Sequence, residues 1–197
     1  NTTVRDNFDV DKLALEWYFL RTPLENWYEL KDGHLALELR PQVADSLVNP
    51  SLVARRIEHI AFSASAKMKF SSRKSNEQAG MIVYRVSNGH IQFIKCGNEL
   101  VLVSTTRAGK KELARVPYKK AEVVLRIVSD GKDMRFYYGE SEDALTDMGV
   151  AQPLSIISDE KVSGGFNGPY VGMYATSNGK SSKSKVWFDW FDYEGKF

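Results

Sequence analysis

Apolar and polar residues alternate along much of the chain, which is the pattern of β-strands. Every second residue from Phe62 to Phe70 is apolar, and the residues between them are serine or lysine. A period of two with one polar face predicts a half-buried strand of an antiparallel sheet.

Further strands follow at short intervals and are separated by turn residues. They are predicted at residues 81–86, 91–96, 100–103, 123–128, 134–138, 170–175 and 185–193. Asn88-Gly89 and Gly97-Asn98 lie between consecutive strands, and such pairs supply the positive φ angles of tight hairpins. His90 adjoins the first of these turns and is predicted to be solvated.

Helical periodicity is weak throughout. Residues 52–60 and 143–148 are the only short candidates for a helix. Strands spaced about 8–12 residues apart with glycine turns are typical of a sandwich or barrel. No linker, repeat or low-complexity block divides the 197 residues, which suffice for a single core. The sequence therefore predicts one all-β domain over residues 1–197.

Composition excludes several partners. Lys+Arg 27 against Asp+Glu 25 leaves a net charge of +2, too balanced for a nucleic-acid surface. No apolar run approaches the roughly 18 residues of a membrane span. Cys96 is the only cysteine, so the chain forms no intrachain disulfide and no multi-cysteine zinc site. The location stays undetermined: for a bacterial protein we favour the periplasm or the exterior, with the cytoplasm as the alternative.

Catalytic and metal motifs are not recognisable, and we assign no catalytic and no metal-binding residue. The three histidines His34, His59 and His90 are far apart and never stand at metal-ligand spacing. Hydrolysis of a glycosidic bond needs two carboxyl groups about 5–10 Å apart. In a regular strand Asp189 and Asp192 point to opposite faces, so this pair is not expected to act on one substrate.

Aromatic side chains are the more informative positive signal. Sugars present flat apolar faces and many hydroxyl groups, which suit Trp and Tyr as well as polar side chains. A sandwich core would also consume aromatic residues, so each candidate has a structural alternative. The candidates are Trp17, Trp27, Tyr84, Tyr118, Tyr137 and Tyr170.

Seven segments, taken in order, resemble one family. They are 6–9 (DNFD), 15–23 (LEWYFLRTP), 33–37 (GHLAL), 51–56 (SLVARR), 78–84 (QAGMIVY), 166–173 (FNGPYVGM) and 188–193 (FDWFDY). With these segments the chain is similar to the C-terminal concanavalin-A-like domain of β-xylosidases and related enzymes of glycoside hydrolase family 43. The resemblance covers about residues 6–193 and implies a jelly-roll sandwich of two antiparallel sheets.

The resemblance also implies a role. In that family a separate five-bladed propeller carries the catalytic acids, and the sandwich packs beside it and helps close its sugar pocket. We therefore expect a noncatalytic C-terminal part of a longer glycosidase that acts on xylan- or arabinan-derived oligosaccharides. A face that covers a partner domain predicts an exposed aromatic patch. Residues expected to contact the sugar or the propeller are Trp17, Tyr84, Arg55, Arg56 and Tyr170.

Three alternatives remain open at this stage. The chain could be an independent carbohydrate-binding module, which predicts a row of two or three exposed aromatic side chains. It could be a free-standing glycosidase whose carboxylates meet only after folding. Of the adjacent Arg55 and Arg56, one could point outward while the aliphatic part of the other packs against the protein. No cofactor is expected, although a structural calcium ion near Asp6, Asp9, Asp189 and Asp192 is left open.

Overall fold

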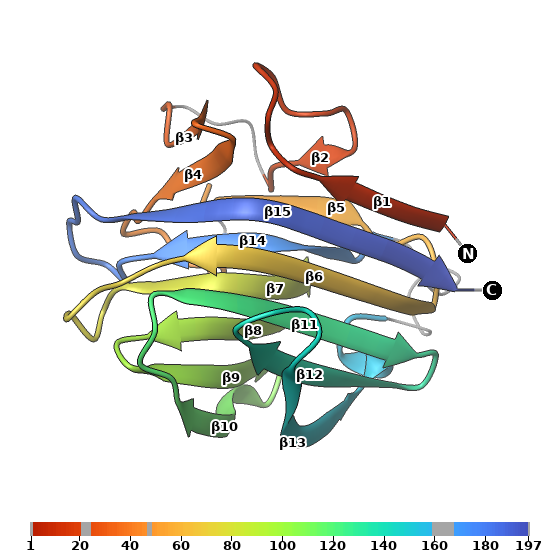
Figure 1. Cartoon of the computed structure of the whole chain (residues 1–197). Coiled ribbons are helices and arrows are strands. Elements are labelled where there is room, and N and C mark those ends of the chain that lie inside the picture. Colours follow the sequence, from red (N-terminus) through yellow and green to blue (C-terminus); the bar gives the residue numbers. More distant parts are fainter. Residues whose placement is uncertain (1, 21–24, 47–48, 159–167, 197) are drawn as a thin grey trace.

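The computed structural model describes residues 2–20, 25–46, 49–158 and 168–196. Two antiparallel sheets stack on each other, and β15, β6 and β11 overlie β14, β7 and β8 in Figure 1. The strands are β1 (Thr2–Asp6), β2 (Trp17–Tyr18), β3 (Tyr28–Lys31), β4 (His34–Glu38), β5 (Ser51–Arg56), β6 (Ala61–Lys69), β7 (Gln78–Val86), β8 (Gly89–Cys96), β9 (Glu99–Thr106), β10 (Gly109–Pro117), β11 (Glu122–Asp130), β12 (Asp133–Gly139), β13 (Leu145–Pro153), β14 (Tyr170–Thr176) and β15 (Lys185–Lys196).

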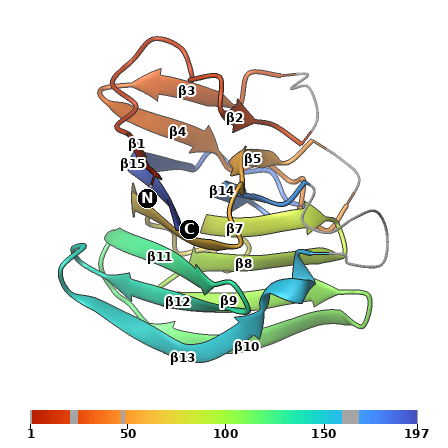
Figure 2. The ribbon, with the colours of Figure 1, turned by 90° about the vertical axis from the view of Figure 1, so that its right-hand side faces the viewer.

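The order of strands differs from their order in sequence. The eight-stranded sheet runs β13-β12-β11-β6-β15-β4-β3, with β1 paired to β15. The seven-stranded sheet runs β10-β9-β8-β7-β14-β5-β2. Consecutive strands β7 to β10 form a meander, whereas β14 and β15 insert into the middle of different sheets. Figure 2 shows the two layers from the side. The predicted sandwich of two antiparallel sheets is confirmed.

The main core lies between the sheets. The apolar residues Phe62, Ala64, Ala66 and Met68 of β6 all belong to it, as the alternation predicted. Lys67 and Lys69 lie on the opposite face of the same strand. The seven other predicted strands are also present, extended by one to three residues at their ends.

The two short helix candidates are wrong. Residues 51–56 form β5, and residues 145–153 form β13. Val53 of β5 faces the main core, whereas Leu52 and Ala54 belong to a second apolar cluster on the outer face, so successive residues of this strand are fully buried. A strand that is buried on both faces loses its alternation, which explains the misleading pattern. Among the described residues, the only helix is the single 3₁₀ turn Leu154–Ile156.

A buried carboxylate fastens one end of the sandwich. Glu77, just before β7, accepts hydrogen bonds from the hydroxyl groups of Ser72, Ser182 and Ser184. These serines belong to two loops that are about 100 residues apart in sequence. Burial alone would raise the pKa of Glu77, but the serine hydrogen bonds and nearby Lys74 outweigh it and hold the pKa below its usual value.

Candidate functional site

A second apolar cluster covers the outer face of the seven-stranded sheet. Its members point away from the main core and are nevertheless buried. Part of the cover is the segment 41–46, because the backbone amide of Ala44 donates to the hydroxyl of Tyr174 at 2.9 Å. The hydroxyl of Thr176 donates to the carbonyl oxygen of Gln42, also at 2.9 Å. The buried members are Ala44, Leu52, Ala54, Ile82, Tyr84, Ile94, Val101, Val103 and Tyr174.

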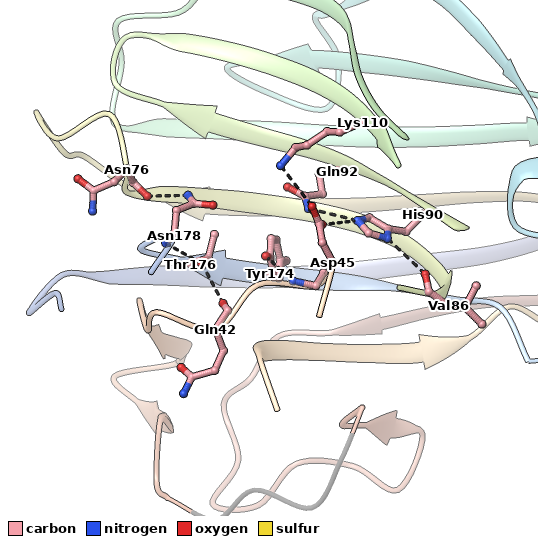
Figure 3. A network of polar contacts seen from close by, with 11 residues as sticks. Gln42, Asp45, Asn76, Val86, His90, Gln92, Lys110, Tyr174, Thr176 and Asn178 are labelled. Carbon is pink, nitrogen blue, oxygen red and sulfur yellow. Dashed lines mark hydrogen bonds and ion pairs between the residues drawn. The ribbon is translucent and has the colours of Figure 1, made fainter. Parts of the chain in front are cut away.

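His90, near the start of β8, lies on this face and is fully buried (Figure 3). Its Nε2 lies 3.1 Å from Oδ1 of Asp45, and its Nδ1 lies 3.3 Å from the carbonyl oxygen of Val86. The Tyr84 ring stacks on the imidazole at 5.5 Å between centroids. The prediction of a solvated His90 is wrong, because β8 already begins at Gly89 and the distant Asp45 closes over the ring.

Asp45 belongs to the segment 41–46 and attaches it to the outer face of the sheet. Its Oδ1 also accepts a hydrogen bond from Gln92 at 3.4 Å, and Nζ of Lys110 lies 3.5 Å from its Oδ2. The hydrogen bond with His90, followed by the positive charge of Lys110, lowers the pKa of Asp45. Asp45 is therefore an ionised carboxylate that fixes the segment in place, with both oxygens engaged by protein donors.

A cavity of about 540 Å³ opens beside this carboxylate. Asp45 and Lys110 form one wall, and Asn178 lies opposite (Figure 3). Its remaining walls include the segment 41–46, in which Oε1 of Gln42 is buried with no hydrogen-bond partner. The lining combines the apolar Pro41 and Val43 with polar side chains and charges of both signs, so it suits a ligand with hydroxyl groups better than an anion.

Three of the predicted contact residues share this outer face. Tyr84 is buried against His90, and Tyr170 is half-buried. The ring of Tyr18 packs against Tyr170 at 5.6 Å, so β2 and β14 carry an aromatic pair at one end of the sheet. Arg56 follows on β5 and is exposed. Tyr18, at 46% exposure, is the only exposed aromatic residue among those described, so the predicted aromatic patch is small.

Trp17 and Arg55 lie on the other side of the sheet. The indole nitrogen of Trp17 donates to Oδ2 of Asp6 at 2.8 Å, and its ring packs edge-on against Phe191. The guanidinium group of Arg55 lies 4.0 Å from the centre of the Tyr193 ring. Both are buried and do not share a face with Tyr84. The two arginines therefore divide as considered, one packed and one outward.

Asp45, Gln92 and Lys110 were missed by the sequence argument. Alternation alone could have placed His90 and Gln92 together, because Ile91 and Phe93 between them belong to the main core. Asp45 lies in a segment without secondary structure, 45 residues before His90. No short-range pattern joins these two positions.

Comparison with known proteins identifies the domain. A sequence model of the β-xylosidase C-terminal concanavalin-A-like domain matches residues 5–194. The chain belongs to this family. It is 29% identical to a non-reducing end α-L-arabinofuranosidase of Bacteroides ovatus, over 96% of this chain. It is 27% identical to a xylosidase/arabinosidase of Butyrivibrio fibrisolvens, over 98% of this chain.

A solved structure agrees with this assignment. The family 43 glycoside hydrolase of Bacillus licheniformis superposes with a TM-score of 0.90 and 28% identity over 98% of this chain. The chain spans only 37% and 38% of the length of the Bacteroides and Butyrivibrio relatives, and 39% of the Bacillus structure. The β-xylosidase C-terminal domain is thus one part of considerably longer proteins in these relatives.

The acids near the end of this C-terminal domain lie differently from the expectation. A β-bulge in β15 interrupts its pairing with β6 between Phe188 and Trp190. Asp189 lies on the outer surface, 3.8 Å from Lys67, and Asp192, beyond the bulge, consequently lies on the same face and pairs with Arg5 at 2.9 Å. The argument that the two acids point to opposite faces is therefore wrong. Each of them is engaged by a cation.

Metal ligands are not gathered in the described part of the domain. No group of three or more His, Cys, Asp or Glu side chains there could hold a metal ion. Asp6 accepts hydrogen bonds from Trp17 and from the amide of Phe8. A structural calcium ion stays a prediction. Within the same residues, no helix is long and apolar enough to cross a membrane.

Proposed function

We propose that this chain is the noncatalytic accessory domain of a family 43 glycosidase. In this role it braces the catalytic propeller of the same polypeptide and helps to shape its sugar pocket. The observation that carries the proposal is coverage: nearly the whole chain aligns with relatives that are named as glycosidases, yet it spans only 37% and 38% of them. More than half of each relative is therefore available for the catalytic machinery.

The side chains of the domain support a role without catalysis. Both oxygens of Asp45 are engaged by His90, Gln92 and Lys110. Glu77 is buried beneath three serine hydroxyl groups. A general acid or nucleophile of a glycosidase must instead reach the scissile bond. The carboxylates at these two sites are positioned to hold loops.

The relatives suggest the class of substrate. Their names join xylosidase and arabinosidase activities, so the proposed parent enzyme hydrolyses xylosyl or arabinofuranosyl bonds. Xylan- and arabinan-derived oligosaccharides would then be its substrates. The outer face around Tyr18, Tyr170 and Arg56 is the part of this domain that we expect near the sugar pocket, because it combines exposed aromatic and hydrogen-bonding groups.

The test compares the complete translated polypeptide that contains residues 1–197 with the isolated chain. We expect the complete polypeptide to hydrolyse an aryl β-D-xyloside or an aryl α-L-arabinofuranoside, and the isolated chain to hydrolyse neither. Removing the domain should lower the melting temperature of the catalytic part and its kcat/KM. Hydrolysis by the isolated chain, or a complete polypeptide without a further domain, contradicts the proposal.

An independent carbohydrate-binding module is the second candidate. The aromatic pair of Tyr18 and Tyr170 is the observation in its favour, because adjacent rings provide a surface on which a sugar can stack. This function predicts saturable binding of oligosaccharides by the isolated chain. It also predicts that Tyr170→Ala abolishes the binding while Tyr137→Ala, on the other sheet, leaves it unchanged.

A further inference from the structure

Positive charge gathers at one end of the sandwich. Residues 71–77 lie between β6 and β7, and residues 177–184 lie between β14 and β15, at the left end of the molecule in Figure 1. We call these two segments the basic loops. Their exposed cations are Arg73, Lys74, Lys180 and Lys183. The balanced net charge of the chain therefore conceals a local excess of positive charge.

The cations of the basic loops are not compensated by ion pairs. Within the described part of the chain, none of their four side chains lies in an ion pair with a carboxylate. The single carboxylate of the basic loops, Glu77, is buried and engaged by three serine hydroxyl groups. By contrast, Lys120 at the same end of the sandwich pairs with Glu140. Exposed charges of one sign that lie close together attract ligands of the opposite sign.

Hydrogen bonds hold the two basic loops against each other. The side-chain amide of Asn76 donates to the carbonyl oxygen of Ser177 at 3.0 Å. The side-chain amide of Asn178 donates back to the carbonyl oxygen of Asn76 at 2.7 Å (Figure 3). Glu77 adds the bonds from Ser182 and Ser184 across the same contact. The cations are thus presented from a fixed backbone, which lowers the entropy that binding a ligand would cost.

The composition of the basic loops distinguishes between anionic ligands. They contain no aromatic side chain, on which single-stranded nucleic acids stack their bases, and no large apolar side chain, which a membrane surface would take up. Exposed serines lie among the cations instead. The cavity beside Asp45 adjoins the basic loops, because Asn178 and Gly179 are among its lining residues. Cations next to groups that hydrogen-bond hydroxyls fit a sugar chain that carries carboxylates.

We propose that the basic loops bind an acidic polysaccharide, a polymer in which some sugar units carry a carboxylate. The choice of a polysaccharide rests on the proposed function, because an enzyme that hydrolyses xylan-derived glycosides works among such polymers. Arg73 suits a carboxylate with two parallel hydrogen bonds, and the lysines act as point charges. Binding at this second place would hold the enzyme on its polymer. A neutral oligosaccharide lacks the carboxylates and gains none of this attraction.

The test is electrophoresis of the isolated chain in native gels that contain a xylan bearing glucuronic acid groups. We expect retardation by this polymer, none by the same polymer after reduction of its carboxyl groups, and loss of the effect in about 0.5 M sodium chloride. The double variant Arg73→Gln/Lys180→Gln should raise the dissociation constant about tenfold.

Lys132→Gln/Lys196→Gln is the matched control. It removes the same charge at exposed positions of the opposite end, in the turn after β11 and at the end of β15, and should leave the dissociation constant unchanged. Both double variants should keep the wild-type melting temperature, because all four side chains are exposed. Equal losses in the two double variants would overturn the inference, because net charge and not the basic loops would then explain the binding.

The remaining outcomes separate this inference from the proposed function. Equal retardation by the carboxyl-reduced polymer, or tighter binding to duplex DNA or to vesicles of anionic lipid, would overturn the acidic polysaccharide as the ligand. If no acidic polymer binds while the complete polypeptide hydrolyses an aryl glycoside, only this inference fails. If the acidic polymer binds but the complete polypeptide has no catalytic domain, only the accessory role fails.

Discussion

The outer faces of the two sheets are built on different principles. On the eight-stranded sheet, Lys67, Asp189, Asp192 and Arg5 form ion pairs at the surface. On the seven-stranded sheet, a second apolar cluster is covered in part by residues 41–46 and contains the buried His90. The outer face of the eight-stranded sheet is thus charged and exposed, whereas that of the seven-stranded sheet is apolar and partly covered by another segment of the chain. This difference favours the outer face of the seven-stranded sheet as the side of the domain that makes further contacts.

The largest expected difference concerns one outward-pointing side chain on each sheet. Ile82 points outward from β7 and is fully buried, so Ile82→Ala should lower the free energy of unfolding by about 2–5 kcal/mol. Lys67 points outward from β6, and Lys67→Ala should cost less than about 1 kcal/mol. Urea denaturation measures both. Equal losses would remove the distinction between the faces.

The hydrogen bond between His90 and Asp45 should have the next largest effect. His90→Ala removes the buried partner of Asp45 and should cost about 1–3 kcal/mol in urea denaturation. Lys110 contacts the same carboxylate from an exposed position, so Lys110→Ala serves as the matched control and should cost less than about 1 kcal/mol. If the two variants lose the same stability, burial of the histidine is not what fixes residues 41–46.

The ionised Asp45 should make the free energy of unfolding depend on pH in the acidic range. Its pKa is lower in the folded chain than in the unfolded chain, so ionisation stabilises the fold above the unfolded pKa of about 4. This contribution disappears as the pH falls from about 4 through the folded pKa. Asp45→Asn should therefore lose less stability than the wild type between pH 5 and pH 3. Identical pH profiles in urea denaturation would contradict a stabilising role for the carboxylate.

Surface ion pairs should give the smallest change. Arg5 pairs with Glu142 and Asp192 and stacks over Trp190, but it is partly exposed. Arg5→Ala should cost about 1 kcal/mol or less, and the loss should shrink further in 1 M salt. A larger loss that salt does not reduce would show that this face also depends on buried interactions.

Local alternation was sufficient to predict most of the meander. One face of β6 packs in the core and the other faces solvent, so its period of two is visible in the sequence. The glycine-containing turns mark the ends of β7 to β9. β5 was mistaken for a helix candidate because apolar clusters cover both of its faces and bury successive residues. The bulge in β15 brought Asp192 to the same face as Asp189, because one inserted residue changes the parity of everything beyond it.

The candidate site depended on contacts that a sequence does not display. Asp45 reaches His90 across 45 residues, and no motif connects them. The predicted contacts divided between the faces, because strand parity places Tyr84, Tyr170 and Arg56 outward and Trp17 and Arg55 inward. Family resemblance suggested the role that we propose and that the residues alone left open.

Calorimetric titration of the isolated chain with xylo- and arabino-oligosaccharides at millimolar concentrations tests the central claim most directly. An accessory domain completes a sugar pocket only together with its catalytic partner, so we predict no saturable heat. Saturable heat that Tyr170→Ala abolishes would contradict this account and show a domain that binds carbohydrate by itself.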